Sequence, residues 1–215
     1  MQQTTKARAW FGLTALAAFA GVLIQMIVTA NEKAVHFHTP LSRSLNVLVF
    51  FTIDSNLIVG ATCLVLATNP KRSSTTFNTA RLTGVVAITI TGLVYHAVLA
   101  KLLDLESWAL VADNLTHTLV PVMGVLGWLI FGPRGLTSSR VTRLTLIFPL
   151  AWIVFTLIRG SIIDFYPYPF IDVTHLGYAR VLVNCVWIAI LYLALAAGAS
   201  ALDRRLARTA HSPGP

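Results

Sequence analysis

The sequence predicts an all-α integral membrane protein, a bundle of six transmembrane helices that forms one domain over residues 1–215. Of the 215 residues, 56% are hydrophobic and only 11% are charged, whereas soluble domains carry roughly 25% charged residues. A helix needs roughly 20 residues to cross the hydrocarbon core of a bilayer. Six apolar segments meet that length, at about 10–30, 45–68, 79–102, 113–132, 142–160 and 178–201.

Short polar breaks separate these segments, for example at Asn69-Pro70 and Gly132-Pro133, because proline and glycine end helices. The first segment runs from Trp10 to about Ala30. That is longer than the roughly 7–15 apolar residues of a signal peptide, so it is predicted to be the first membrane helix. Residues 203–215 are predicted to be a polar C-terminal tail.

The distribution of basic residues predicts the orientation in the membrane. Eleven of the 16 lysines and arginines fall at the N-terminus, in the second and fourth loops and after the last segment. The positive-inside rule therefore predicts that the N and C termini are cytoplasmic and that the first, third and fifth loops face outward. Since short loops between spans hold most of the positive charge, the formal charge of +8 does not indicate a nucleic-acid partner.

Motifs for soluble enzymes and for cofactors are absent from the sequence. It contains no GxSxG, HExxH, P-loop or GxGxxG pattern. Cys63 and Cys185 lie in apolar segments without a CxxC neighbour, so we expect buried thiols and no metal site. No cofactor is predicted.

Polar side chains concentrate in the outer halves of the predicted helices. Thr52, Ser55 and Asn56 share one face of the second helix at 3.6 residues per turn. On these spans, Thr52 would lie roughly 10 Å below the outer end of its helix. Other outer-half polar residues include His96, Asn114, His117, Thr118, Arg159, Arg180 and Asn184. Their similar depth predicts one shared cavity that opens to the outer leaflet.

Asp54 points nearly opposite Thr52 on the same predicted helix. A carboxylate inside a membrane normally pairs with a cation. We expect it to pair with Arg159, with Arg180 or Arg43 as alternatives.

A hydroxyl, an imidazole and several amides or cations in one cavity are sufficient for acyl transfer. A threonine hydroxyl needs an adjacent base, usually histidine, and the tetrahedral oxyanion needs hydrogen-bond donors. Asn56, Asn114, Asn184 or Arg159 could donate, and Asp113, Asp164 or Asp172 could orient the base; spacing does not choose among them. Interhelical hydrogen bonding remains the simpler role for each Ser, Thr and Asn taken singly.

Two short blocks resemble a known family. Phe50-Phe51-Thr52-Ile53-Asp54-Ser55-Asn56-Leu57 resembles the FFT-x-x-S-N-L stretch of the androgen-induced, FAR-17a-like membrane proteins. Asn114-Leu115-Thr116-His117-Thr118-Leu119-Val120-Pro121 resembles the same family's histidine-bearing stretch, and the six-span plan is similar to its bacterial Pr6Pr branch.

The resemblance implies an atypical threonine hydrolase that cleaves fatty acid esters of hydroxy fatty acids or similar lipid esters. It implies Thr52 as nucleophile and His117 as general base. The remaining candidates for substrate or oxyanion contacts are Ser55, Asn56, Asn114, Asn184, Arg159, His96 and Arg180. The predicted partners are a fatty acyl ester substrate and membrane lipids, and the predicted location is a cell membrane, the inner membrane of a bacterium.

Two other functions stay open at the sequence level. The protein could bind or transport a lipid or small molecule, with Arg159 and Arg180 pairing an anionic head group. It could also carry a haem between His96 and His117, although no second histidine pair lies on the cytoplasmic side for transmembrane electron transfer. The sequence contains no signal for an oligomeric state.

Overall fold

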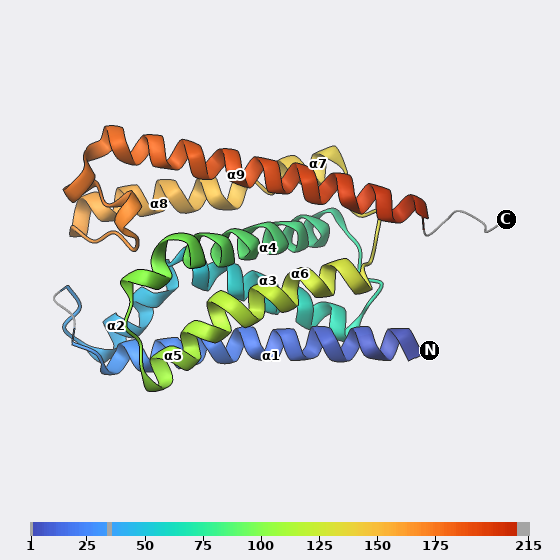
Figure 1. The fold of residues 1–215 in the computed structure, drawn as a ribbon, viewed down its shortest axis with the longest axis horizontal. Helices are drawn as coiled ribbons and strands as arrows, with labels where there is room; N and C mark the ends of the chain where they lie inside the picture. The colour runs from blue at the N-terminus through green and yellow to red at the C-terminus, as the bar shows by residue number, and fades with distance from the viewer. Residues whose placement is uncertain (1, 34–35, 210–215) are drawn as a thin grey trace.

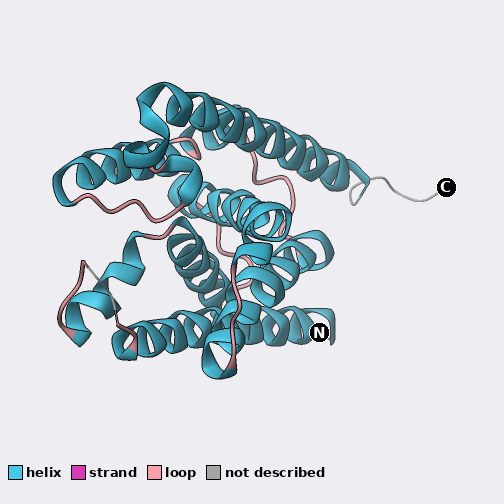
Figure 2. Cartoon of the chain, turned by 60° about the vertical axis from the view of Figure 1, so that its left-hand side comes forward, coloured by secondary structure: helices cyan, strands magenta, loops and turns pink. Residues whose placement is uncertain are grey.

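The computed structural model describes residues 2–33 and 36–209, and in these residues it contains helices and loops but no strand (Figures 1 and 2). Six helical segments are long and apolar enough to cross a membrane: Thr4–Asn31, Phe51–Thr68, Thr75–Leu102, Ser107–Phe131, Ser139–Ile163 and Val173–Thr209. The all-helical class and the six candidate spans are therefore confirmed.

The α-helices are α1 (Gln2–Asn31), α2 (Pro40–Asn46), α3 (Phe51–Thr68), α4 (Thr75–Val94), α5 (Ser107–Asn114), α6 (Val120–Phe131), α7 (Ser139–Leu144), α8 (Ile147–Ile163) and α9 (Val173–Thr209). Short 3₁₀ turns lie at Val47–Val49, Ala100–Leu102 and Pro169–Ile171. Two π-helical turns, Tyr95–Leu99 and Leu115–Leu119, interrupt the third and fourth spans. Such turns are rare and occur frequently at functional sites.

Helix α4 lies at the centre of the bundle, with α1, α3 and α6 on one side and α8 and α9 on the other (Figure 1). Phe11, Ala18 and Val59 belong to the core between α1 and α3. Val86 and Tyr192 belong to the core between α4 and α9. Large apolar side chains on the opposite faces of α1, α8 and α9 remain exposed, as expected for surfaces that contact lipid.

The second span differs from its predicted extent of 45–68, because the helix breaks at Phe50. This residue has an extended backbone, with φ −83° and ψ 130°, so α3 begins only at Phe51. The Trp152 indole donates a hydrogen bond to the Val49 carbonyl at 3.1 Å and holds the broken end. Thr52 therefore lies in the first turn of α3, and its predicted position roughly 10 Å below the helix end is wrong.

The predicted polar tail of 203–215 also begins too early. Helix α9 continues through Thr209, and the rest of the tail lies outside the described residues. Asp203 is 1% exposed, because its carboxylate accepts hydrogen bonds from the Gly135 and Thr137 backbone N–H groups at 3.1 Å and from the Thr137 hydroxyl at 2.8 Å. These bonds attach the end of α9 to the loop before α7. The first turn of α1 and the last turn of α9 lie at the same end of the bundle (Figure 1).

Candidate functional site

An apolar cavity of about 610 Å³ lies between α3, α4, α8, α9 and the loop after α8. Its walls are mostly aliphatic and aromatic side chains such as Ile90, Trp152 and Ile171. The hydroxyl-bearing side chains among its lining residues are Thr52, Thr91, Tyr95, Tyr168 and Tyr192. A volume of about 300–1,000 Å³ with few polar groups is typical of a small-molecule site, so this cavity is the candidate binding site.

Thr52 faces this cavity and is hydrogen-bonded to a tyrosine from a distant loop. The Tyr168 hydroxyl accepts a hydrogen bond from the Thr52 N–H at 3.1 Å and lies 3.2 Å from Thr52 Oγ1. The break at Phe50 is the reason that this N–H is free, since in a continuous helix it would bond the carbonyl four residues earlier. Thr52 is 7% exposed and Tyr168 8% exposed, so both hydroxyls are buried together.

Ser55 and Asn56 support Thr52 from the next turn of α3. The Ser55 hydroxyl donates to the Thr52 carbonyl at 2.9 Å and lies 2.9 Å from the Thr91 hydroxyl of α4. The Asn56 amide donates to the Thr52 carbonyl at 2.8 Å and to the Thr116 carbonyl at 3.1 Å. Their polar hydrogens are therefore used within the protein, and both residues fix the position of Thr52 against neighbouring helices.

His117 lies in the π-helical turn Leu115–Leu119 and forms a compact cluster with Asp113 and Tyr95. Its Nδ1 is 2.8 Å from Asp113 Oδ1, and the Tyr95 hydroxyl donates to Asp113 Oδ2 at 2.6 Å. The Tyr95 ring stacks on the imidazole, with centroids 3.9 Å apart and an interplanar angle of 15°. Asp113 therefore contacts His117, whereas the other two aspartates considered from the sequence bond elsewhere.

Those two aspartates lie in the loop between α8 and α9. Asp164 accepts a hydrogen bond from the Thr174 hydroxyl at 2.7 Å. Asp172 caps α9 and is 2.8 Å from His175 Nδ1. Burial alone would raise the pKa of Asp172, but hydrogen bonds from the His175 ring and from the backbone of His175 and Thr174 outweigh it and lower this pKa below its ordinary value.

Thr52 and His117 form no direct hydrogen bond with one another. Asn56 links their helices through the Thr116 carbonyl. Tyr95 separates the two groups, because it lines the cavity with Thr52 while its ring covers the imidazole. The cavity is therefore not shared as predicted: of the candidate site residues named from the sequence, Thr52 is the one that lines it. His117 lies on the other face of the Tyr95 ring.

The remaining polar candidates are positioned away from the Thr52 hydroxyl. His96 Nε2 lies 3.1 Å from the Thr118 hydroxyl, and the Tyr95 ring packs against both this histidine and His117. The Tyr95 ring thus occupies the space against these imidazoles where a haem between them would have to fit. The Asn114 amide donates to the Leu110 carbonyl of its own helix at 2.9 Å.

The outer-half cations and Asn184 are likewise bound elsewhere or exposed. Arg159 donates to the Asn46 side-chain oxygen at 2.7 Å, and Arg180 is exposed. The Asn184 amide donates to the Phe170 carbonyl at 2.7 Å.

The expected ion pair of Asp54 does not form among the described residues. Its three candidate partners lie elsewhere. Arg159 donates to the Asn46 side chain, Arg43 donates to the Ala30 carbonyl in the last turn of α1, and Arg180 is exposed. The physical reason is the packing of the bundle, which brings Arg159 to the Asn46 side chain at the end of α2 while Asp54 lies in the first turn of α3.

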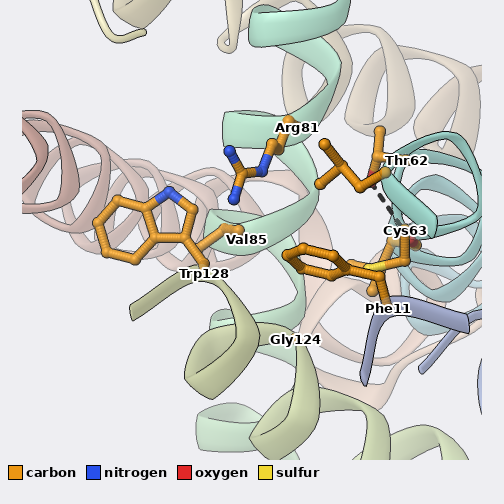
Figure 3. Close-up of a pocket in the computed structure, with 9 residues that line it drawn as sticks. Phe11, Thr62, Cys63, Arg81, Val85, Gly124 and Trp128 are labelled. Atoms are coloured by element: carbon orange, nitrogen blue, oxygen red, sulfur yellow. Dashed lines mark hydrogen bonds between the residues drawn. The ribbon is translucent and has the colours of Figure 1, made fainter. Parts of the chain in front are cut away.

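A second pocket lies on the far side of the bundle core, between α1, α3, α4 and α6. Phe11, Cys63, Arg81 and Trp128 surround it (Figure 3). Its volume is about 10 Å³, roughly the space of one water molecule. The Arg81 guanidinium donates to the Gly132 and Pro133 carbonyls, so this arginine holds a loop and the pocket is too small for a substrate.

Sequence reasoning missed the contact between Tyr168 and Thr52. Tyr168 lies in the sequence Tyr166-Pro167-Tyr168-Pro169, whose prolines predict a restricted backbone. That signal does not identify the helix that the tyrosine contacts, because the partner lies 116 residues away.

Comparison with protein-family models, with curated proteins and with solved structures finds no match for this chain. The functional assignment therefore depends on the geometry of the site.

Proposed function

We propose that this multi-pass membrane protein is a threonine hydrolase that cleaves lipid esters within the membrane. The observation that carries the proposal is the position of the Thr52 hydroxyl, at the wall of a cavity of about 610 Å³ that is otherwise almost entirely apolar. A hydroxyl at one end of an apolar cavity is the arrangement that an ester with a fatty acyl chain requires. In this proposal Thr52 is the nucleophile and His117 the general base.

The dimensions of the cavity fit one acyl chain. Its lining residues on α9 extend from Leu182 to Leu193, a separation of eleven residue steps that corresponds to about 16 Å at 1.5 Å per residue. Half of a hydrocarbon core of about 30 Å is one leaflet, so the cavity has the length of an ordinary lipid tail. Apolar walls along that length would hold the tail while its ester group meets Thr52.

The histidine cluster supports the role of a base. Asp113 at His117 Nδ1 leaves Nε2 as the nitrogen that can take a proton. Asp113 would also stabilise the imidazolium that forms when Thr52 gives up its proton. Because the Tyr95 ring lies between the two groups, proton transfer requires this ring to move aside and the Thr52 hydroxyl to turn from Tyr168 toward His117 when substrate binds. Catalytic hydrogen bonds often form only in the substrate complex.

The excess of basic residues in the loops at one end supports an orientation with both termini in the cytoplasm. In a bacterium this corresponds to the inner membrane, with the Thr52 end of the cavity toward the outer leaflet. The substrate would then be drawn from that leaflet.

The test is hydrolysis of a medium-chain p-nitrophenyl ester by purified wild type, Thr52→Ala and His117→Ala. Thr89→Ala is the matched control for Thr52, because it removes a threonine hydroxyl of α4 that does not line the cavity and bonds the Val85 carbonyl of its own helix. His175→Ala removes the other histidine that is bonded to an aspartate. We expect activity to be lost in the first two variants and kept in both controls. Full activity in Thr52→Ala would show that the nucleophile is another residue.

The second candidate function is binding or transport of a lipid or small molecule without hydrolysis. It is favoured by one observation: the Thr52 hydroxyl bonds Tyr168 and makes no hydrogen bond to His117. Cys185 lines the cavity, and Cys63→Ser would leave it as the single thiol. Protection of Cys185 from maleimide by a fatty acid, without any ester hydrolysis, would favour binding. Neither protection nor hydrolysis would argue against both functions.

A further inference from the structure

We propose that the Tyr168 hydroxyl is a catalytic hydrogen-bond donor that stabilises the oxyanion when Thr52 attacks an ester. The inference rests on the proposed function, and it adds a residue from the loop after α8 to the Thr52 and His117 pair. Its first support is proximity, since the Tyr168 hydroxyl lies 3.2 Å from Thr52 Oγ1 and 3.1 Å from Thr52 N. A carbonyl bonded by Thr52 must place its oxygen beside these same atoms.

The second support is that the donors expected from the sequence are committed elsewhere. Asn56 donates to two backbone carbonyls, Asn114 to Leu110 and Asn184 to Phe170, while Arg159 donates to the Asn46 side chain. None of these four side chains forms a hydrogen bond with the Thr52 hydroxyl in the described part of the chain. Among the described residues, Tyr168 is the side chain whose hydrogen bond to the Thr52 hydroxyl is already made.

The third support is that Tyr168 is held rigidly. Prolines on both sides restrict the backbone, and Tyr168 has the extended conformation, φ −138° and ψ 142°, that a residue before proline prefers. Its ring lies 5.2 Å from Phe170 in a stacked arrangement, 5.6 Å from Phe50 edge-on and 5.9 Å from Trp152. A donor fixed before the reaction costs no reorganisation during it, which is the property of an effective oxyanion hole.

The protonation state of Tyr168 also suits a donor. Burial raises the pKa of Tyr168 to about 12, so the hydroxyl keeps its proton at physiological pH. A neutral phenol at this position can give a hydrogen bond but cannot act as a base. The base must then be a different group, which agrees with the role proposed for His117.

The proposed step can be written atom by atom. The Thr52 oxygen forms a bond to the carbonyl carbon while its proton passes to His117, and the carbonyl π electrons move onto oxygen. The Tyr168 O–H and the Thr52 N–H each donate a hydrogen bond to that oxyanion without losing their protons. Collapse re-forms the carbonyl and expels the alkoxide, which takes the proton from His117, and water then hydrolyses the acyl-threonine in the same way.

The experiment compares Tyr168→Phe with Tyr166→Phe in the full-length protein, using the p-nitrophenyl ester. Both changes remove one hydroxyl from the same loop. Tyr166 packs against Gly160, and its hydroxyl has no hydrogen bond within the described residues. Loss of one oxyanion donor costs about 100- to 1000-fold in kcat. We expect this loss in Tyr168→Phe with KM unchanged, and no loss in Tyr166→Phe.

A second measurement separates transition-state stabilisation from packing. An alkyl trifluoromethyl ketone forms a tetrahedral adduct with the nucleophile, whereas the matching alkyl alcohol only fills the cavity. Tyr168→Phe should weaken inhibition by the ketone by about the factor lost in kcat and leave inhibition by the alcohol unchanged. If Tyr168→Phe unfolds, two unnatural residues at position 168 replace it in the test. 3-Fluorotyrosine keeps the ring and the hydroxyl, so the protein that carries it should retain activity. 4-Fluorophenylalanine lacks the hydroxyl, so the protein that carries it should lose activity.

The outcomes distinguish the two proposals. Wild-type activity that depends on Thr52 but is equal in Tyr168→Phe and Tyr166→Phe would overturn the role of Tyr168 and leave the hydrolase intact. Equal weakening of the ketone and the alcohol would also overturn it, because it would mean that Tyr168 only shapes the cavity. Absence of wild-type hydrolysis together with absence of ketone binding would instead refute the hydrolase.

Discussion

Replacing Asp113 by asparagine separates the charge of the His117 partner from its shape. Asp113 lies 2.8 Å from His117 Nδ1 and accepts a hydrogen bond from Tyr95 at 2.6 Å. An asparagine has the same size, and it can accept from the imidazole N–H while it donates to the Tyr95 oxygen. The variant should therefore keep the orientation of the ring and lose only the negative charge.

The size of the effect follows from the distance and the burial of the pair. Two unit charges about 4 Å apart interact by about 4 kcal/mol at an effective dielectric constant of about 20. Since the His117 side chain is 17% exposed, solvent screening lowers this value, and we take about 2 kcal/mol as the lower bound. With 1.36 kcal/mol per tenfold change, the expected loss of kcat is about 30- to 1000-fold.

The assay is steady-state ester hydrolysis by Asp113→Asn, with Asp172→Asn as the matched control. Asp172 is also 2.8 Å from a histidine Nδ1, but that His175 ring is 80% exposed and belongs to a loop. We expect kcat to fall in the first variant and to stay at the wild-type value in the second. Wild-type kcat in Asp113→Asn, with His117→Ala inactive, would refute the reasoning that the carboxylate stabilises an imidazolium.

Two further predictions concern stability. A Cβ atom at Gly21 would lie 2.9 and 3.0 Å from two side-chain atoms of the π-helical turn 115–119, whereas one at Gly12 would be 3.9 Å from its nearest neighbour. We therefore expect Gly21→Ala to lower the free energy of unfolding by about 1–3 kcal/mol and Gly12→Ala to leave it unchanged. Equal unfolding midpoints of the two variants in detergent would contradict this. Because hydrogen bonds from His175 hold the pKa of Asp172 below 3.8, its contribution to stability should be present above about pH 4 and disappear as the pH falls through the folded pKa. Asp172→Asn should remove that part of the acid destabilisation, and unfolding midpoints that fall equally with pH in variant and wild type would argue against it.

Local features of the sequence predicted much of the fold. The six spans follow from apolar length, because a segment in lipid must satisfy its own backbone hydrogen bonds within a helix. Thr52, Ser55 and Asn56 also lie close together as predicted, since helical spacing alone places them on one face. The prediction failed at the start of α3, where contacts from Trp152 and Tyr168 stabilise a break at Phe50 that no local pattern indicates.

The candidate site was predictable only in part. The sequence indicated Thr52 and His117 as the residues of interest and left three aspartates as possible partners of the histidine. The choice of Asp113 became clear from the structure, because the π-helical turn and the Tyr95 ring determine where the imidazole points. The expected pairing of Asp54 failed for a related reason: the position of an arginine depends on the whole bundle and not on its depth along one helix.

By itself, the sequence determined that this chain is helical, with six segments long and apolar enough to span a membrane, because that property depends on the length and composition of each segment. Only the tertiary structure decided that Thr52 lines an apolar cavity of about 610 Å³ while His117 lies outside it, against the Tyr95 ring. It also decided that the Thr52 hydroxyl bonds Tyr168, a residue 116 positions away. Contacts between distant segments depend on how all six helices pack, and that information is not contained in any one of them.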